Sequence, residues 1–268
     1  MKANISLAQL NLTISRPKEN FQKGLIRIEE AARSGSQVIL LPELWTSGYD
    51  LEYCARYAKD NQDILADLQS AAVRYNLWVG GSVIDERDGK FYNSFYLFAP
   101  DPVASLRYDK NHLFRLMHEE QWFAPGNGPV IADLPWGKTG LAICYDLRFP
   151  ELFRLYALQG VEIIFLVSEW PIQRIDHWKT LLRARAIENQ FFFAAVNSVG
   201  PIGNTMYGGY SAVIGPWGET IIEGTPDQDE LLNCQVDLDE VSRVRKRIPV
   251  FKDRRPDIYQ NDKSGFPQ

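Results

Sequence analysis

A cysteine, a glutamate and a lysine stand near the ends of apolar segments in this sequence, and together they could perform nucleophilic catalysis. Cys144 follows the apolar segment 140–143 and precedes Pro150, an order typical of a strand, a sharp turn and a helix that begins at the proline. We expect its thiol to be exposed near the helix N-terminus, whose positive end favours a thiolate. The alternative is a buried, inert thiol, the common state of a free cysteine and the one we expect for Cys54 and Cys234.

A histidine or a carboxylate could activate the Cys144 thiol. None of the histidines follows an apolar strand, and their spacing does not match that of a zinc helix: they are His112, His118 and His177. We therefore expect no metal site. Glu43 is better placed, because it follows Pro42 and the four apolar residues 38–41. A carboxylate at a mostly buried strand end is a stronger base than one in water.

Lys110 lies between aromatic and apolar neighbours in the segment 106–114, not in a run of charges. A cation at this place could stabilise an oxyanion or hold Cys144 as a thiolate. Taken alone, Lys110 could equally be a solvated surface lysine, and Glu43 an ordinary loop glutamate. The combination of a carboxylate, a cation and a thiol favours a catalytic site.

The elements that must position these groups alternate between strands and helices. Short apolar segments bounded by turn residues predict strands over 5–12, 38–41, 78–84, 92–98, 130–134, 139–143, 162–167, 191–197, 207–214, 219–222 and 231–236. Helical spacing predicts helices over 17–35, about 60–75, from 150 onward and about 173–189. The alternation indicates a layered α/β protein with a mixed sheet system. We expect a single domain over residues 1–268, with an irregular tail from about residue 254.

Composition limits the class of protein and its partners. The chain has 268 residues and a formal net charge of −5, and with 45% apolar and 24% charged residues it has ordinary globular composition. Mild acidity without a basic stripe argues against a nucleic-acid partner. Three cysteines are too few for a disulfide framework and fit a reducing compartment. The sequence also lacks a signal-peptide pattern and an apolar run long enough to span a membrane, so we expect a cytoplasmic protein.

Motifs over nearly the whole chain resemble the nitrilase superfamily of carbon–nitrogen hydrolases. Glu43 in LLPEL, Lys110 in YDKNHLF and Cys144 in ICYDLRFPE have that superfamily's order and rough spacing. The similarity extends to the N-terminal AQLN, to APG at 124–126, to RARAIENQ at 183–190 and to GGYSAVIGPWGE at 208–219. It implies a four-layer α-β-β-α sandwich, a homodimer or higher homo-oligomer, and hydrolysis without a metal or an organic cofactor.

The resemblance also implies roles for individual residues. Glu43 would be the general base and Cys144 the nucleophile that forms a thioester. Lys110 would stabilise the tetrahedral intermediate together with the backbone N–H of Tyr145. A second glutamate is expected shortly before the Pro-Gly turn, and spacing back from Gly126 favours Glu119 over its neighbour Glu120.

The sequence after the cysteine, Tyr-Asp-Leu-Arg-Phe-Pro-Glu, differs from the Trp-Glu common in true nitrilases. It resembles the amidase branches that act on small carboxylate-bearing amides, and 177–190 is similar to bacterial omega-amidases. This implies hydrolysis of 2-oxoglutaramate or 2-oxosuccinamate to the 2-oxo diacid and ammonia. The alternatives are a deaminated-glutathione amidase, an N-carbamoyl amino acid amidohydrolase, a non-catalytic binding protein on the same fold, and a redox-sensing thiol protein.

The roles of three residues near the expected pocket are not fixed by the sequence. Glu169 is acidic where related sequences often have a neutral residue, and a carboxylate there could repel an acidic substrate. Trp170 follows a strand and could shape the substrate site or simply pack in the core. Arg148 could bind a substrate carboxylate, but we expect it to form a structural ion pair with Asp146 or Glu151.

Overall fold

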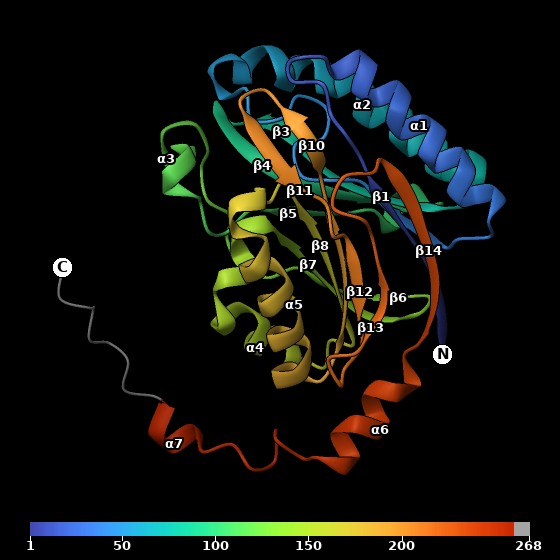
Figure 1. Ribbon diagram of the computed structural model, residues 1–268, viewed down its shortest axis with the longest axis vertical. Coiled ribbons are helices and arrows are strands. Elements are labelled where there is room, and N and C mark those ends of the chain that lie inside the picture. The colour runs from blue at the N-terminus through green and yellow to red at the C-terminus, as the bar shows by residue number, and fades with distance from the viewer. Residues whose placement is uncertain (260–268) are drawn as a thin grey trace.

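Two six-stranded sheets pack face to face in the computed structural model, which describes residues 1–259 (Figure 1). The first sheet has the strand order β14-β1-β2-β3-β4-β5, and the second has the order β13-β12-β9-β8-β7-β6. Helices α1 and α2 lie outside the first sheet, and α4 and α5 lie outside the second (Figure 1). This arrangement confirms the predicted α-β-β-α sandwich.

The first sheet combines parallel and antiparallel pairs. Its strands are β1 (Lys2–Gln9), β2 (Val38–Leu40), β3 (Trp78–Arg87), β4 (Lys90–Phe98), β5 (Leu106–Asp109) and β14 (Glu230–Asp237). Strands β1, β2 and β3 are parallel to one another, whereas β14 and β4 run antiparallel to their neighbours. Helices α1 (Pro17–Arg33) and α2 (Cys54–Tyr75) cover the outer face. Proline in the first turn of α1 and the left-handed Gly35 after its end fix the limits of this helix.

The second sheet has a parallel centre. Its strands are β6 (Ile131–Leu134), β7 (Gly137–Ile143), β8 (Ile163–Ser168), β9 (Phe192–Asn197), β12 (Ala212–Ile214) and β13 (Thr220–Glu223). Strands β7, β8 and β9 are parallel, and β8 and β9 are buried along their whole length, as expected for strands covered on both faces. Helices α4 (Pro150–Leu158) and α5 (Ile175–Asn189) cover the outer face.

The main core lies between the two sheets. Successive side chains of a strand point to opposite faces of its sheet. In β1, Ile5 and Leu7 therefore belong to the core between the sheets, while Ala8 belongs to a second core under α1 and α2. Phe95 of β4 and Phe165 of β8 belong to the same inter-sheet core. This close packing makes the two sheets a rigid frame for the residues at their ends.

Several elements differ from the sequence expectations. Helix α2 begins at Cys54 rather than near residue 60, and β5 and helix α6 (Asp239–Arg247) were not predicted. The strand expected over 207–214 is divided between a hairpin strand, β11 (Thr205–Gly208), and β12. The described part of the tail contains the one-turn helix α7 (Pro256–Tyr259), and the tail beyond residue 259 lies outside the described residues.

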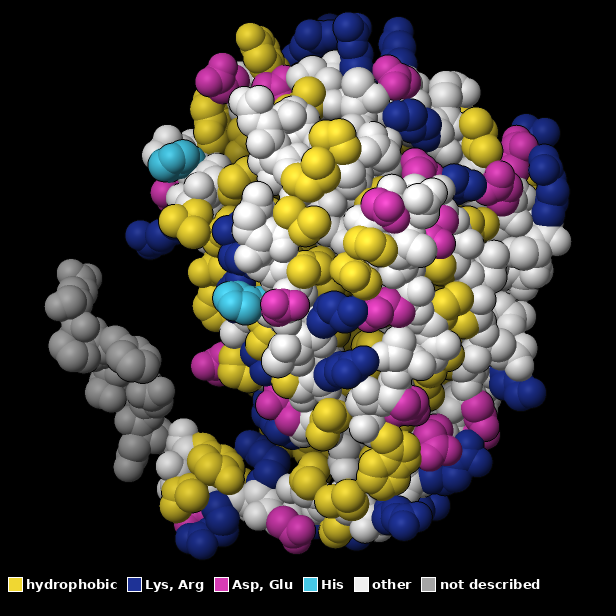
Figure 2. All heavy atoms as spheres, viewed as in Figure 1, with side chains coloured by type: hydrophobic (Ala, Val, Ile, Leu, Met, Phe, Trp, Pro, Cys, Tyr) yellow, Lys and Arg dark blue, Asp and Glu magenta, His cyan; other side chains and the backbone are white. Residues whose placement is uncertain are grey.

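The remaining elements are short. They are β10 (Val199–Ile202), which pairs with β11, the helix α3 (Glu119–Trp122), and 3-10 helices at Leu51–Tyr53, Pro102–Ala104, Arg115–Met117, Cys144–Arg148 and Ile172–Arg174. No helix within residues 1–259 is long and apolar enough to cross a membrane. Basic and acidic side chains are interspersed over the face shown in Figure 2, so the net charge of −5 is not gathered into one patch there.

Candidate active site

Four candidate residues follow the ends of strands that meet at one edge of the sandwich. Glu43 lies three residues beyond β2, and Lys110, Cys144 and Glu169 come directly after β5, β7 and β8. Strand ends of a rigid sheet hold side chains more firmly than long loops do. The frame therefore brings together residues that are 126 positions apart in sequence, as the hydrogen bond from Glu169 N to Glu43 Oε2 (3.0 Å) demonstrates.

Lys110 is the centre of a buried charge cluster. Its Nζ donates hydrogen bonds of 2.8 Å to Glu43 Oε1 and 2.6 Å to Glu119 Oε1, and the three side chains are fully buried. Tyr49 Oη lies 2.7 Å from the same two oxygens. Asn93 Nδ2 donates to Glu43 Oε1 at 2.8 Å. The cluster satisfies the hydrogen-bonding needs that make buried charges costly.

The position of the second glutamate follows from this geometry. Glu119 Oε1 contacts Lys110, and Glu119 Oε2 accepts a 2.7 Å hydrogen bond from Phe114 N, whereas Glu120 is exposed. The structure thus brings Glu119, and not Glu120, to Glu43 and Lys110.

Electrostatics keep Lys110 charged. Burial alone would lower the pKa of Lys110, but the neighbouring Glu119 and Glu43 carboxylates outweigh burial and raise it. Burial raises the pKa of Glu119, and the charge of Glu43 adds to this effect, while Lys110 opposes it. One cation between two carboxylates leaves the cluster with an excess negative charge, which favours a proton on one carboxyl.

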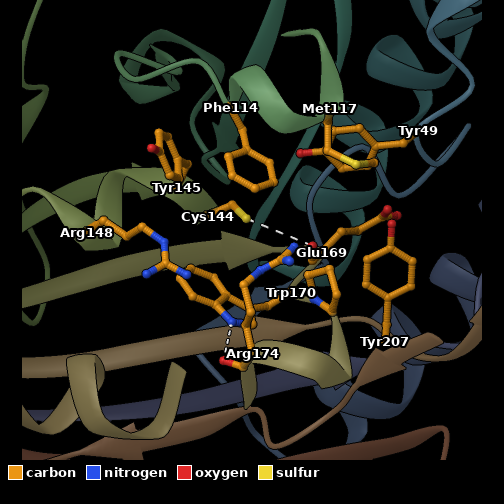
Figure 3. Close-up of a pocket in the computed structure, with 11 residues that line it drawn as sticks. Tyr49, Phe114, Met117, Cys144, Tyr145, Arg148, Glu169, Trp170, Arg174 and Tyr207 are labelled. Carbon is orange, nitrogen blue, oxygen red and sulfur yellow. Dashed lines mark hydrogen bonds between the residues drawn. The ribbon is translucent and has the colours of Figure 1, made fainter. Parts of the chain in front are cut away.

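Cys144 occupies a tight turn. Its φ of +42° lies in the left-handed region that residues with a Cβ seldom adopt, and it begins the 3-10 helix after β7. Asp146 holds this turn, because its Oδ2 accepts a 2.9 Å hydrogen bond from Ile143 N. The turn aims the thiol at the pocket in Figure 3, where it makes a long 4.0 Å hydrogen bond to the main-chain oxygen of Glu169.

The expected exposure of the Cys144 thiol is wrong. The residue is only 7% exposed. Burial raises its pKa well above the ordinary value, the charge of Glu43 raises it further, and Lys110 offsets only part of the shift. Cys144 is therefore a neutral thiol before substrate binds. The cost of burying a charged thiolate exceeds the stabilisation that the N-terminus of one short helical turn provides.

We expect Cys144 to give no thiolate signal near neutral pH. The ultraviolet thiolate absorbance should be the same for the wild type and for Cys144→Ser from mildly acidic to mildly alkaline pH, and a difference should emerge only in strong alkali. Cys54 and Cys234 do not obscure this comparison, because burial raises their pKa values to about 12 and about 11. A thiolate band at neutral pH that Cys144→Ser removes would contradict this expectation.

A pocket opens in front of Cys144 (Figure 3). Besides Cys144 it is lined by Tyr49, Phe114, Met117, Tyr145, Arg148, Glu169, Trp170, Pro171, Arg174 and Tyr207. Phe114 and Tyr145 contact each other with ring centroids 4.7 Å apart. Both residues named from sequence for substrate contact, Tyr145 and Trp170, lie in this wall, and Trp170 also packs in the core.

Two arginines, Arg148 and Arg174, face the pocket without an ion-pair partner among residues 1–259. The expectation that Arg148 pairs with Asp146 or Glu151 is wrong, because its guanidinium lies 4.8 Å from the centre of the Trp170 ring. The guanidinium carbon of Arg174 lies 5.5 Å from the centre of the Phe114 ring. Burial lowers the pKa of Arg148, and the charge of Arg174 lowers it further.

Sequence reasoning missed Arg174, Tyr49 and Tyr207 as pocket residues. Arg174 could have been found from its place four residues after Trp170, in the segment that follows β8. The Trp170 Nε1 atom donates a 2.8 Å hydrogen bond to Arg174 O and fixes that turn (Figure 3). No sequence pattern marks Tyr207, which reaches the pocket from the β10–β11 hairpin.

The sandwich fold, together with a buried carboxylate, lysine and cysteine beside one pocket, defines an amide-hydrolysing enzyme of the α-β-β-α type. The chain belongs to the carbon-nitrogen hydrolase family, whose model matches residues 4–246. The family, the fold class and the hydrolytic amidase activity inferred from sequence are thus confirmed.

Curated relatives and solved structures resemble the chain over nearly its whole length. It is 38% identical to the 2-oxoglutaramate amidase of Bacillus subtilis (strain 168), over 97% of this chain and 100% of the relative. It is 32% identical to the omega-amidase NIT2 of Bos taurus, over 96% of this chain and 98% of the relative. The crystal structure of XC1258 from Xanthomonas campestris, a CN-hydrolase superfamily protein, superposes with a TM-score of 0.89 at 31% identity, over 95% of this chain and 98% of that one.

Proposed function

We propose that this enzyme hydrolyses the terminal amide of a small carboxylate-bearing substrate, 2-oxoglutaramate or 2-oxosuccinamate, to the 2-oxo diacid and ammonia. The observation that carries the proposal is the pair Arg148 and Arg174, which face the pocket of Cys144 without carboxylate partners in the described chain. A guanidinium group binds a carboxylate through two parallel hydrogen bonds. The identity to a 2-oxoglutaramate amidase and to an omega-amidase supports the same substrate class.

Acylation begins with proton transfer from the neutral Cys144 thiol to Glu43. The sulfur attacks the amide carbon, and the carbonyl electron pair moves to oxygen. Lys110 has three N–H donors, of which Glu43 and Glu119 accept two; the third has only a 3.3 Å contact with Tyr49 Oη and can turn to the oxyanion. The Tyr145 N–H is the second donor in this proposal. Glu43 then passes its proton to nitrogen, the C–N bond breaks, and ammonia leaves a thioester on Cys144.

Deacylation uses the same groups, with water in place of the thiol as the nucleophile. Glu43 takes a proton from water, whose oxygen attacks the thioester carbon, and Lys110 again faces the oxyanion. The C–S bond breaks, and the proton on Glu43 returns to the Cys144 sulfur. Glu119 touches no reacting atom in this scheme; it holds Lys110 in place through the 2.6 Å hydrogen bond.

Ammonia release from a panel of amides tests the proposal. We expect turnover of 2-oxoglutaramate and of its analogue succinamate, with deaminated glutathione and an N-carbamoyl amino acid as competitors. Turnover of deaminated glutathione or the carbamoyl compound with inert 2-oxoglutaramate and succinamate would overturn the substrate assignment and leave the family intact.

Removing the arginines should weaken binding of the substrate carboxylate. We expect Arg148→Ala and Arg174→Ala each to lower kcat/KM for succinamate about 10- to 100-fold, mainly through KM, because a charge-assisted hydrogen bond contributes about 1.5–3 kcal/mol. Butanamide, which has a methyl group in place of the carboxylate, should be affected far less. Arg56→Ala is the matched control, since this arginine is exposed on α2 and outside the pocket. Equal losses on both substrates would contradict carboxylate recognition.

The proposal retains two further expectations from the sequence, a cytoplasmic location and a homodimer or larger homo-oligomer. Sedimentation velocity of the purified full-length chain measures the second. We expect a species of at least twice the 30.7 kDa chain mass, and a monomer over the micromolar range would contradict it.

A further inference from the structure

Glu169 carries a carboxyl group that the catalytic scheme does not use. The residue is 3% exposed, and its buried Oε1 and Oε2 make no hydrogen bond of good geometry in the described chain, although the Tyr207 hydroxyl lies close enough to interact with the carboxyl. Such groups are rare in folded proteins, because an unsatisfied polar group in the interior costs stability. The carboxyl also lines the pocket of Cys144. A buried polar group aimed into a substrate pocket calls for a ligand atom as its partner.

The main chain of Glu169 fixes this residue beside the reacting groups. Its N–H donates a 3.0 Å hydrogen bond to Glu43 Oε2, and its carbonyl oxygen lies 4.0 Å from the Cys144 sulfur. In Figure 3 the side chain extends away from Arg148 and ends beside the Tyr207 hydroxyl. Glu169 and Arg148 therefore lie on opposite sides of Cys144 in this view.

The two sides of Cys144 must receive different parts of an amide. The acyl chain runs from the carbonyl carbon toward Arg148, if this arginine binds the substrate carboxylate as proposed above. The leaving nitrogen lies toward Glu43, because Glu43 must protonate it. Since Glu169 adjoins Glu43 and its side chain points away from Arg148, its carboxyl faces the leaving nitrogen.

We propose that Glu169, backed by Tyr207, closes the leaving-group side of the pocket and restricts hydrolysis to unsubstituted amides. The carboxyl accepts a hydrogen bond from the amide nitrogen and occupies the space that a substituent on this nitrogen would need. This inference rests on the substrate orientation of the proposed function.

A neutral Glu169 suits this role. Burial raises the pKa of its carboxyl well above the usual range, and the charge of Glu43 raises it further; the Tyr207 hydroxyl and Lys110 oppose the shift. A neutral carboxyl neither adds a second negative charge beside Glu43 nor repels a carboxylate substrate. The repulsion considered from sequence therefore does not arise in this arrangement.

The test compares succinamate with N-methylsuccinamate in the full-length enzyme. The wild type should prefer the primary amide by about 10- to 200-fold, the usual value of one methyl group in a closed pocket. Glu169→Ala should shift the ratio of the two kcat/KM values toward the N-methyl amide by about tenfold or more. Glu169→Gln keeps the volume and an amide acceptor, and should keep the wild-type ratio within about threefold.

Two further variants make the result decisive. Glu169→Asp shortens the side chain by one methylene and should shift the ratio in the same direction, which covers the case in which Glu169→Ala does not fold. Met206→Ala, an exposed neighbour of Tyr207, is the control and should keep the wild-type ratio. An unchanged ratio in the folded Ala and Asp variants overturns the role of Glu169. A wild type inert toward both amides overturns the proposed function instead, so the two failures are distinct.

Discussion

Cys144→Ala is expected to lower kcat for 2-oxoglutaramate by at least about 10⁴-fold, because it removes the only thiol that lines the pocket within the described chain. Cys54 belongs to a separate core cluster near α2, and Cys234 lies on β14, so neither thiol can replace it. The loss should appear in kcat rather than in KM. The variant keeps Arg148 and Arg174 and should still bind the substrate.

Mass spectrometry of the acyl-enzyme is a second, independent test of the same prediction. Acid quenching of the wild type during turnover of succinamate should trap a succinyl group on the peptide that contains Cys144, and Cys144→Ala should show none. Cys54→Ala and Cys234→Ala are the matched controls and should retain both turnover and the acyl group. Full activity of Cys144→Ala would exclude the thioester mechanism, and binding without turnover by the wild type would favour the non-catalytic alternative.

The strand ends made the centre of the site predictable from sequence. Glu43 and Cys144 each follow an apolar segment, and such segments become strands whose ends a sheet places side by side. Lys110 was identified from its apolar surroundings, although β5 itself was not predicted. That strand has only four residues, and its apolar period is too short to distinguish it from a loop.

The pocket wall could not be derived in the same way. Arg148 stands two positions from Asp146, and sequence proximity suggested an ion pair. In the structure the Asp146 carboxylate is already occupied by Ile143 N, His112 and Tyr108, so the arginine turns to the Trp170 ring. Which partner a side chain chooses depends on the competing donors around it. These donors come from distant segments.

The protonation state of Cys144 depends on the same three-dimensional context. A cysteine before a helix suggested an activated thiolate, but activation by a helix N-terminus requires aligned peptide groups close to the sulfur. Cys144 begins a five-residue 3-10 helix and is buried beside the Glu43 carboxylate. Burial depth is not encoded in the local motif. The consequence for mechanism is that Glu43 must act before the sulfur can attack.

Replacing Lys110 should have the largest combined effect on stability and activity. Lys110→Met leaves Glu43 and Glu119 buried beside each other without their cation. Breaking a buried ion pair from one side costs about 3–5 kcal/mol of unfolding free energy. Loss of an oxyanion donor lowers kcat by about 10²–10³-fold. Chemical denaturation and ammonia release measure the two effects, with the exposed Lys18→Met as the control.

A compensating variant separates the two effects. Lys110→Met with Glu119→Gln removes one negative charge together with the cation, and should recover much of the lost stability but none of the activity, because the oxyanion donor is still missing.

The stability loss caused by Lys110→Met should also depend on pH, because it comes from the same unpaired carboxyl groups. Unpaired buried carboxyls have folded-state pKa values above their unfolded ones, so the deficit of Lys110→Met should shrink as pH falls and grow as pH rises through the unfolded carboxyl pKa. A deficit that is independent of pH, or activity that returns with stability, would show that Lys110 serves the fold alone.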